Sequence, residues 1–312
     1  MQPDVILVEP LPPSIEAELE ASYTVHRIDG PDDLEGVPDA IRKSVRAVVT
    51  GGGTGVSRRL VEGLPALGIV AINGVGTDAV DLDHAKAQGV RVTNTPDVLN
   101  DDVADMAILL MLAALRGLVV GDRFVREGKW GKGGLPLAAK ATGKRLGIVG
   151  LGRIGRAIAK RAEAFDMEIA YHGRTERGDA PYRFVPSLVD LASWSDVLVV
   201  IAAGGTGTRG LVGREAIDAL GPKGVLVNVA RGSVVDEDAL VDALVAGRLG
   251  AAGLDVFADE PNVPKALLGL DGVVFQPHRG SATVETRHAM GRLVLDNVRA
   301  FFEGEALPTA VV

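Results

Sequence analysis

A glycine motif directly after an apolar strand constrains this chain more than any other feature of its sequence. Residues 146–149 read as a strand, 150–155 are Gly-Leu-Gly-Arg-Ile-Gly, and 156–165 read as a helix. In that context the first glycine permits a tight turn, the second lets a pyrophosphate approach the backbone, and the third lets the helix pack on the strand. The anion would lie at the helix amino terminus. The motif therefore predicts a dinucleotide site.

Short apolar runs alternate with helical segments along the rest of the chain. The expected strands are 5–8, 47–50, 69–72, 90–93, 146–150, 169–171, 197–201, 225–229, 253–256 and 273–276. This alternation predicts an α/β fold with two Rossmann-like domains. We expect a flavodoxin-like substrate domain in residues 1–98 plus 283–312, and a doubly wound parallel-sheet nucleotide-binding domain in residues 99–282.

Charge and cysteine content exclude several classes of partner. The 33 basic and 41 acidic residues give a net charge of −8, and no basic run is present, so neither nucleic acid nor membrane is an expected partner. The absence of cysteine excludes disulfides and thiolate metal sites, and we predict no metal site. It also fits a cytoplasmic location.

The segment after the strand 169–171 bears on the choice of cofactor. NAD-binding folds usually place an acid here to bind the ribose 2′-hydroxyl, whereas this chain has His172, Gly173, Arg174 and Thr175. A guanidinium with a hydroxyl suits a 2′-phosphate, so we predict NADP(H). Alternatively Arg174 is a solvated turn residue and Glu176 binds the ribose, which would allow NAD(H).

Three residues near the carboxyl ends of predicted strands could perform hydride-transfer chemistry. Arg231 follows the strand 225–229, and its planar fork could bind a keto-carboxylate. His278 follows the last strand, and Glu260 lies in the turn before it. A neighbouring carboxylate favours a protonated imidazole, so His278 would be the acid that protonates the nascent alkoxide. Each residue alone could be a cap or a surface residue, and their joint placement in one sheet favours the catalytic interpretation.

Two glycine-rich loops follow strands of the first domain. Asn73-Gly-Val75-Gly76 would expose backbone amides as an anion site. The loop 51–55 has four glycines in five residues and would face the same ligand, although it could instead be a flexible connector.

Four ordered motifs make the chain resemble the D-isomer-specific 2-hydroxyacid dehydrogenases over its whole length. They are GLGRIG at 150–155, NVARGSVVDEDAL at 228–240, GLDVFADEP at 253–261 and PHRGSAT at 277–283. Within that family, residues 73–82 and 95–116 are similar to glyoxylate/hydroxypyruvate reductases and hydroxyphenylpyruvate reductases. The resemblance implies Arg231, Glu260 and His278 as the catalytic set. It also implies that Asp255 binds the nicotinamide carboxamide.

Motifs and resemblance together define the predicted binding residues. For the cofactor they are Gly150, Leu151, Gly152, Arg153, Ile154, Gly155, His172, Gly173, Arg174, Thr175, Ala202, Ala203, Gly204, Thr208, Val229, Ala230, Arg231, Asp255, His278 and Gly280. For the substrate they are Gly52, Gly53, Val75, Gly76, Arg231 and His278, with the amides of Val75 and Gly76 binding its carboxylate.

We therefore predict NADPH-dependent reduction of a small 2-keto acid, such as glyoxylate, hydroxypyruvate or an arylpyruvate, to the D-2-hydroxy acid. The alternative is a nucleotide-sensing, corepressor-like binding protein of the same fold, and turnover distinguishes the two. The apolar helical segment 98–127 would be hard to bury within one subunit, which predicts a homodimer through it.

Overall fold

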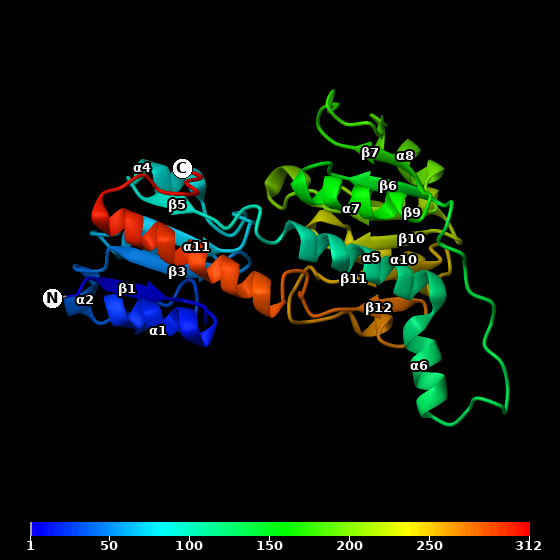
Figure 1. Cartoon of the computed structure of the whole chain (residues 1–312), viewed down its shortest axis with the longest axis horizontal. Helices are drawn as coiled ribbons and strands as arrows, with labels where there is room; N and C mark the ends of the chain where they lie inside the picture. Colours follow the sequence, from blue (N-terminus) through cyan, green and yellow to red (C-terminus); the bar gives the residue numbers. More distant parts are fainter. Residues whose placement is uncertain (1) are drawn as a thin grey trace. The chain divides into compact units, whose positions relative to one another are not determined.

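The computed structural model describes residues 2–312 and consists of two compact units (Figure 1). The first unit contains the residues up to Leu99 together with Ser281–Val312, and the second is Asn100–Gly280. Each unit has its own parallel β-sheet. The α/β class and the two Rossmann-like sheets expected from the sequence are confirmed.

The first unit has a five-stranded sheet in the order β2-β1-β3-β4-β5, which is the flavodoxin-like order. The strands are β1 (Asp4–Leu7), β2 (Thr24–Arg27), β3 (Ala47–Gly51), β4 (Ile69–Asn73) and β5 (Arg91–Thr93). Strand β2 was not among the strands expected from the sequence. This edge strand reads Thr-Val-His-Arg and buries none of its residues, so it has no apolar run to detect.

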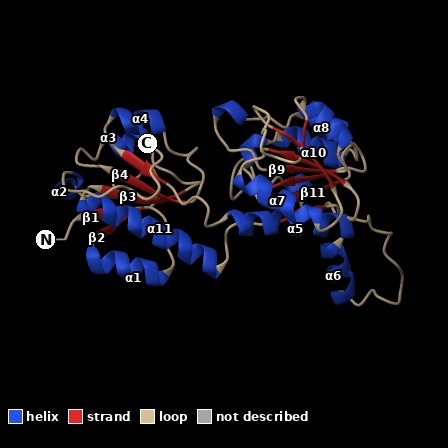
Figure 2. Cartoon of the chain, turned by 45° about the horizontal axis from the view of Figure 1, so that its top comes forward, coloured by secondary structure: helices blue, strands red, loops and turns tan. Residues whose placement is uncertain are grey.

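Helices cover both faces of this sheet, as Figure 2 shows. They are α1 (Pro13–Ser22), α2 (Asp39–Arg42), α3 (Arg58–Glu62), α4 (Leu82–Ala87) and α11 (Val284–Glu303). Val5 and Leu7 pack in a core with residues of α1 and α11, whereas Ile6 packs in the opposite core with residues of α3 and α4. The alternation of β1 thus buries both of its faces, as parallel sheets require. The closing helix α11 belongs to the first unit.

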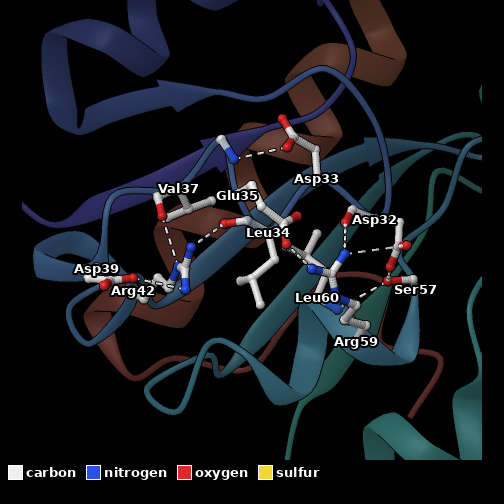
Figure 3. A network of polar contacts seen from close by, with 11 residues as sticks. Asp32, Asp33, Leu34, Glu35, Val37, Asp39, Arg42, Ser57, Arg59 and Leu60 are labelled. Carbon is white, nitrogen blue, oxygen red and sulfur yellow. Dashed lines mark hydrogen bonds and ion pairs between the residues drawn. The ribbon is translucent and has the colours of Figure 1, made fainter.

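Two arginines support the irregular segment between β2 and α2, which Figure 3 shows in close-up. Arg42 donates to the Val37 carbonyl at 2.8 Å and to the Leu34 carbonyl at 2.9 Å. Arg59 donates to the Asp32 carbonyl at 3.2 Å. Guanidinium groups therefore satisfy backbone carbonyls that regular secondary structure would otherwise pair.

The second unit has a seven-stranded parallel sheet in the order β12-β11-β10-β9-β6-β7-β8. The strands are β6 (Arg145–Val149), β7 (Glu168–His172), β8 (Arg183–Phe184), β9 (Val197–Val200), β10 (Val225–Asn228), β11 (Ala251–Leu254) and β12 (Val273–Phe275). The seventh strand, β8, has two residues, too few to show a pattern in the sequence. Strand order reverses between β6 and β9, and ligands of such sheets bind beside the carboxyl ends at this point.

Six helices accompany this sheet. They are α5 (Asn100–Arg116), α6 (Leu118–Arg126), α7 (Arg153–Glu163), α8 (Leu188–Trp194), α9 (Arg214–Leu220) and α10 (Glu237–Val245). Residues of α8, α9 and α10 share one core with the sheet, and α5 packs on α7, β10 and β11. The single helical segment expected over 98–127 is two helices, because Gly117 adopts a left-handed φ of 60° and the chain bends by 62° there.

We expected the segment 98–127 to be hard to bury within one subunit, and this expectation is wrong for α5. Eight of its residues are buried, including Ala107, Leu110 and Met111, because the helix lies against α7 and the sheet of its own unit. The neighbouring α6 differs, since none of its residues is buried. Among the described residues no single helix is long and apolar enough to cross a membrane, and only the bent pair α5 and α6 passes that test together.

Candidate active site

The glycine turn after β6 has the form that a dinucleotide needs. Gly150 has a φ of 102°, and a Cβ at this position would lie 2.8 Å from the Cα of Ala202. A Cβ on Gly155 would overlap the Gly150 carbonyl, so the third glycine allows α7 to approach β6. Gly152, at the amino end of α7, has no atom within 4 Å of the position where a Cβ would stand. The turn therefore leaves open backbone at the helix terminus, where a pyrophosphate fits.

The segment expected at the adenosine ribose continues from the neighbouring strand. The carbonyl of His172, at the end of β7, accepts a hydrogen bond from the Gly150 amide at 2.9 Å. Its ring Nδ1 lies 3.1 Å from the Val185 carbonyl. Arg174 and Thr175 follow, and both are exposed. They thus lie just beyond the glycine turn at the carboxyl edge of the sheet.

The loop after β9 borders the same edge. Ala202 contacts the Gly150 backbone, as the glycine geometry requires. The Thr208 hydroxyl donates to the Ala203 carbonyl at 2.6 Å and closes the turn that contains Gly204. This hydrogen bond gives the glycine-rich loop a defined shape on the side expected for the nicotinamide.

Arg231 lies in a turn that Asn228 shapes. The Asn228 side chain accepts from the Ala230 amide and donates to the Arg231 carbonyl, both at 3.1 Å. A Cβ on the next residue, Gly232, would overlap the Phe257 carbonyl, so the turn packs directly on the loop after β11. This role of Asn228 was not expected from the sequence. Its signal is a polar residue, 2% exposed, that ends an otherwise apolar strand.

The structure brings Glu260 and His278 into direct contact. Glu260 Oε2 lies 2.7 Å from His278 Nδ1, and Oε1 accepts from the Phe257 amide at 3.0 Å. Burial raises the pKa of Glu260, but the hydrogen bond with His278 and the Phe257 amide outweigh burial and lower it overall. His278 Nε2 makes no hydrogen bond within residues 2–312. The pair therefore presents one imidazole nitrogen for proton transfer.

Asp255 accepts hydrogen bonds from the backbone amides of residues 278–280 and so holds the loop that carries His278. Its two carboxylate oxygens accept from the Arg279 amide at 2.6 Å and the Gly280 amide at 2.8 Å, and its carbonyl accepts from the His278 amide at 2.8 Å. His278 adopts a left-handed φ of 52°, which costs energy in a residue with a side chain. Burial raises the pKa of Asp255 despite the two amides. The sequence did not predict this positioning role.

The loop 73–76, which is predicted to bind the substrate carboxylate, belongs to the first unit, and two of its carbonyls are bonded by the segment after β5. Asn94 donates through Nδ2 to the Val75 carbonyl at 2.8 Å, and the Thr95 amide donates to the Gly74 carbonyl at 2.9 Å. The amides of Val75 and Gly76 donate no hydrogen bond within the part of the chain that the structure describes. With the carbonyls bonded and these two amides available, the loop suits an anion.

The second glycine loop, 51–55, is closed by its own hydrogen bonds. The Gly55 amide donates to the Gly51 carbonyl at 2.9 Å, and the Thr50 hydroxyl donates to the Gly55 carbonyl at 2.6 Å. A Cβ on Gly52 would lie 3.3 Å from the Gly76 carbonyl, so the two glycine loops touch. These bonds argue against a flexible connector.

Comparison with known proteins agrees with the geometry. Residues 108–280 match the D-isomer specific 2-hydroxyacid dehydrogenase, NAD binding domain family. The chain is 50% identical over 308 residues to a glyoxylate/hydroxypyruvate reductase of Arabidopsis thaliana, covering 99% of this chain and 98% of that protein. It is 49% identical over 308 residues to a hydroxyphenylpyruvate reductase of Plectranthus scutellarioides, with the same coverage.

A solved structure also agrees over the whole length. It is an NADPH-dependent glyoxylate/hydroxypyruvate reductase of Sinorhizobium meliloti in complex with NADP and malonate. It is 43% identical, has a TM-score of 0.95, and the match covers 100% of this chain and 97% of the other. The family match and these full-length relatives confirm the resemblance seen in the motifs, and the chain therefore belongs to the D-isomer specific 2-hydroxyacid dehydrogenase family.

Proposed function

We propose that this protein reduces small 2-keto acids to D-2-hydroxy acids, with NADPH as the hydride donor. The observation that carries the proposal is the hydrogen-bonded pair of His278 and Glu260 beside the Arg231 turn, in a unit with an intact dinucleotide turn. The candidate substrates are glyoxylate, hydroxypyruvate and arylpyruvates. Names of the relatives support this range, since they are reductases of glyoxylate, hydroxypyruvate and hydroxyphenylpyruvate.

In the proposed mechanism the protein residues bind the keto acid and move one proton. Bound NADPH supplies the hydride for the carbonyl carbon. Arg231 binds the substrate carboxylate and polarises the adjacent carbonyl with its fork of N–H donors. Protonated His278 gives the Nε2 proton to the carbonyl oxygen as negative charge develops there, so the product is a neutral hydroxyl. Glu260 stabilises the protonated imidazole through Nδ1 and fixes its orientation.

The residues after β7 support NADPH over NADH. Arg174 and Thr175 are exposed next to the glycine turn, where a guanidinium and a hydroxyl suit a 2′-phosphate. Glu176 is exposed in the same segment, so it could bind the ribose of NAD(H) instead. A comparison of kcat/KM for NADPH and NADH separates the two. We expect a preference for NADPH, and a preference for NADH would overturn this assignment.

The substrate carboxylate has a second proposed contact in the first unit. The amides of Val75 and Gly76 would bind it, and Gly52 and Gly53 would line the same space. Asp255 and Gly280 are proposed on the nicotinamide side, where Asp255 would also bind the carboxamide.

We also propose that the protein is a homodimer through α6 and the segment that follows it. Leu118, Val119 and Val125 on α6 are exposed, and Trp130 beyond it is 78% exposed. Residues of α6 and of this segment line an apolar cavity of about 370 Å³. Such a concentration of apolar surface is typical of an interface between protein chains. The cytoplasmic location stays a prediction.

Product analysis tests the proposed reaction. Hydroxypyruvate incubated with the enzyme and NADPH is expected to give D-glycerate, resolved from L-glycerate by chiral chromatography. Formation of the L product would contradict the proposed binding geometry. Binding of NADPH without any product would favour the nucleotide-sensing alternative.

A further inference from the structure

Glu9 stands at the carboxyl edge of the first sheet without a basic partner. The Val8 amide donates to the Val49 carbonyl at 2.9 Å, so the chain remains paired beside β3 up to this edge. Glu9 Oε1 accepts a hydrogen bond from the Thr54 hydroxyl. Within residues 2–312 no ion pair joins Glu9 to a lysine, arginine or histidine. Glu9 is half-buried as a residue, and burial of a carboxylate without a countercharge costs free energy that a cation would offset.

The carboxylate lies over the glycine loop that adjoins the predicted anion site. A Cβ on Gly51 would overlap Glu9 Oε2, so a larger residue at position 51 would displace the carboxylate. The next residue, Gly52, is in contact with Gly76. A Cβ placed on Gly52 would lie 3.3 Å from the Gly76 carbonyl oxygen and 3.7 Å from the Gly76 amide nitrogen. Contacts within the first unit therefore lead from Gly76 through Gly52 and Gly51 to Glu9.

We propose that Glu9 determines substrate specificity by accepting a hydrogen bond from a hydroxyl group on the carbon chain of the 2-keto acid. The inference rests on the proposed function. A keto acid bound through its carboxylate at the amides of Val75 and Gly76 would extend its remaining carbons along Gly52 toward this side chain. Glu9 would then select hydroxylated 2-keto acids and reject those with a second carboxylate.

The donor and acceptor inventory supports this selection. A carboxylate only accepts hydrogen bonds, and one donor, Thr54, satisfies Oε1. Oε2 has no hydrogen bond within the described residues and faces the Gly51 backbone. A substrate hydroxyl supplies the missing donor. A methyl group leaves the oxygen unsatisfied, and a second carboxylate adds repulsion between like charges.

Two matched substrate pairs measure these effects. Hydroxypyruvate and pyruvate differ by one hydroxyl, and 2-oxoglutarate and 2-oxopentanoate differ mainly by one charged group. For the unaltered enzyme we expect kcat/KM to favour hydroxypyruvate over pyruvate and 2-oxopentanoate over 2-oxoglutarate. In Glu9→Ala the first ratio is expected to fall roughly tenfold, as for loss of one hydrogen bond to a charged group. The ratio of 2-oxopentanoate to 2-oxoglutarate is expected to fall by a similar factor, because the repulsion between Glu9 and the second carboxylate disappears.

Glyoxylate and a distant carboxylate provide the controls. Glyoxylate has no carbon beyond its aldehyde, so Glu9→Ala is expected to change its kcat/KM by less than about twofold. Glu18→Gln removes a carboxylate from α1, where it pairs with Arg292, and both ratios are expected to stay unchanged. Glu9→Gln keeps the shape of the side chain and removes the charge, so it is expected to lower the second ratio even if Glu9→Ala does not fold.

The outcomes separate the inference from the proposed function. Normal turnover of glyoxylate with unchanged ratios in both Glu9 variants would overturn the inference alone. An equal loss for all five substrates would show a structural role for Glu9 and would also overturn it. If the unaltered enzyme reduces none of these acids, the proposed function fails and the inference fails with it.

Discussion

One carboxylate oxygen of Glu260 contacts His278, and the other accepts a hydrogen bond from the Phe257 amide. The backbone bond thus fixes the position of the carboxylate whose charge faces the imidazole. Its pKa is lowered from the ordinary 4.5, and the carboxylate is therefore ionised throughout the neutral range. Because its folded pKa is depressed, the stability it contributes is present above its ordinary pKa and is lost as the pH falls through the lowered value. The negative charge beside His278 is therefore constant across the neutral pH range.

Replacement of Glu260 by glutamine tests this coupling. The neutral amide would no longer stabilise the positive imidazole, so the decline of reduction at high pH is expected to begin at a lower pH. The measurement is kcat/KM for reduction as a function of pH. Glu237→Gln is the control, because Glu237 accepts a hydrogen bond from the Ala258 amide at 2.9 Å in the same region. A profile for Glu260→Gln that matches the unaltered enzyme would count against the pairing.

The positions of the candidate residues were predictable where these residues lie next to a recognisable strand end. Arg231, Glu260 and His278 each follow or precede such a strand, and the chain order places them at one sheet edge. The supporting contacts were not predictable. Asn228 and Asp255 bond backbone groups of neighbouring turns, and the position of the Glu9 carboxylate depends on a loop 45 positions away. Such contacts require the tertiary fold.

At the scale of elements, the packing of α7 on β6 explains why the third glycine of the turn is needed. Gly155 has no side chain, which allows α7 to approach the Gly150 carbonyl. The open space at Gly152 is a separate feature of the turn. Gly155 therefore serves packing, whereas the open backbone at Gly152 is where we propose that the cofactor binds.

Two alanine substitutions separate these purposes. Gly155→Ala is expected to destabilise the protein by about 1–3 kcal/mol in urea unfolding, because the added methyl forces α7 away from β6. Gly152→Ala is expected to retain nearly full stability but to raise the KM for NADPH, since its methyl fills the space left for the pyrophosphate. A loss of stability in Gly152→Ala together with a raised KM for NADPH alone in Gly155→Ala would contradict this geometry.

Elements with strong apolar periodicity were predicted from the sequence, and the two missed strands share a physical cause. The edge strand β2 and the two-residue β8 bury too little side-chain surface to produce a pattern. The break between α5 and α6 depends on one left-handed glycine, Gly117, within a segment whose composition favours a helix throughout.

At the scale of the whole molecule, the exposed face of α6 predicts the assembly state. Val125→Glu is expected to turn a dimer into a monomer in light scattering at micromolar concentration, because it places a charge in the proposed apolar interface. Val245→Glu on α10 is the matched control, since Val245 is 57% exposed and Val125 is 55% exposed. A monomeric unaltered protein would refute the proposed dimer.

The central claim is that this protein is a reductase and not a nucleotide-binding sensor. The most direct measurement is NADPH oxidation by the purified protein with glyoxylate, hydroxypyruvate and phenylpyruvate, compared with His278→Ala. We expect steady oxidation with at least one of these acids and a loss of roughly a hundredfold or more in the variant, as for removal of the general acid. Absence of oxidation with every acid, or full activity without His278, would contradict it.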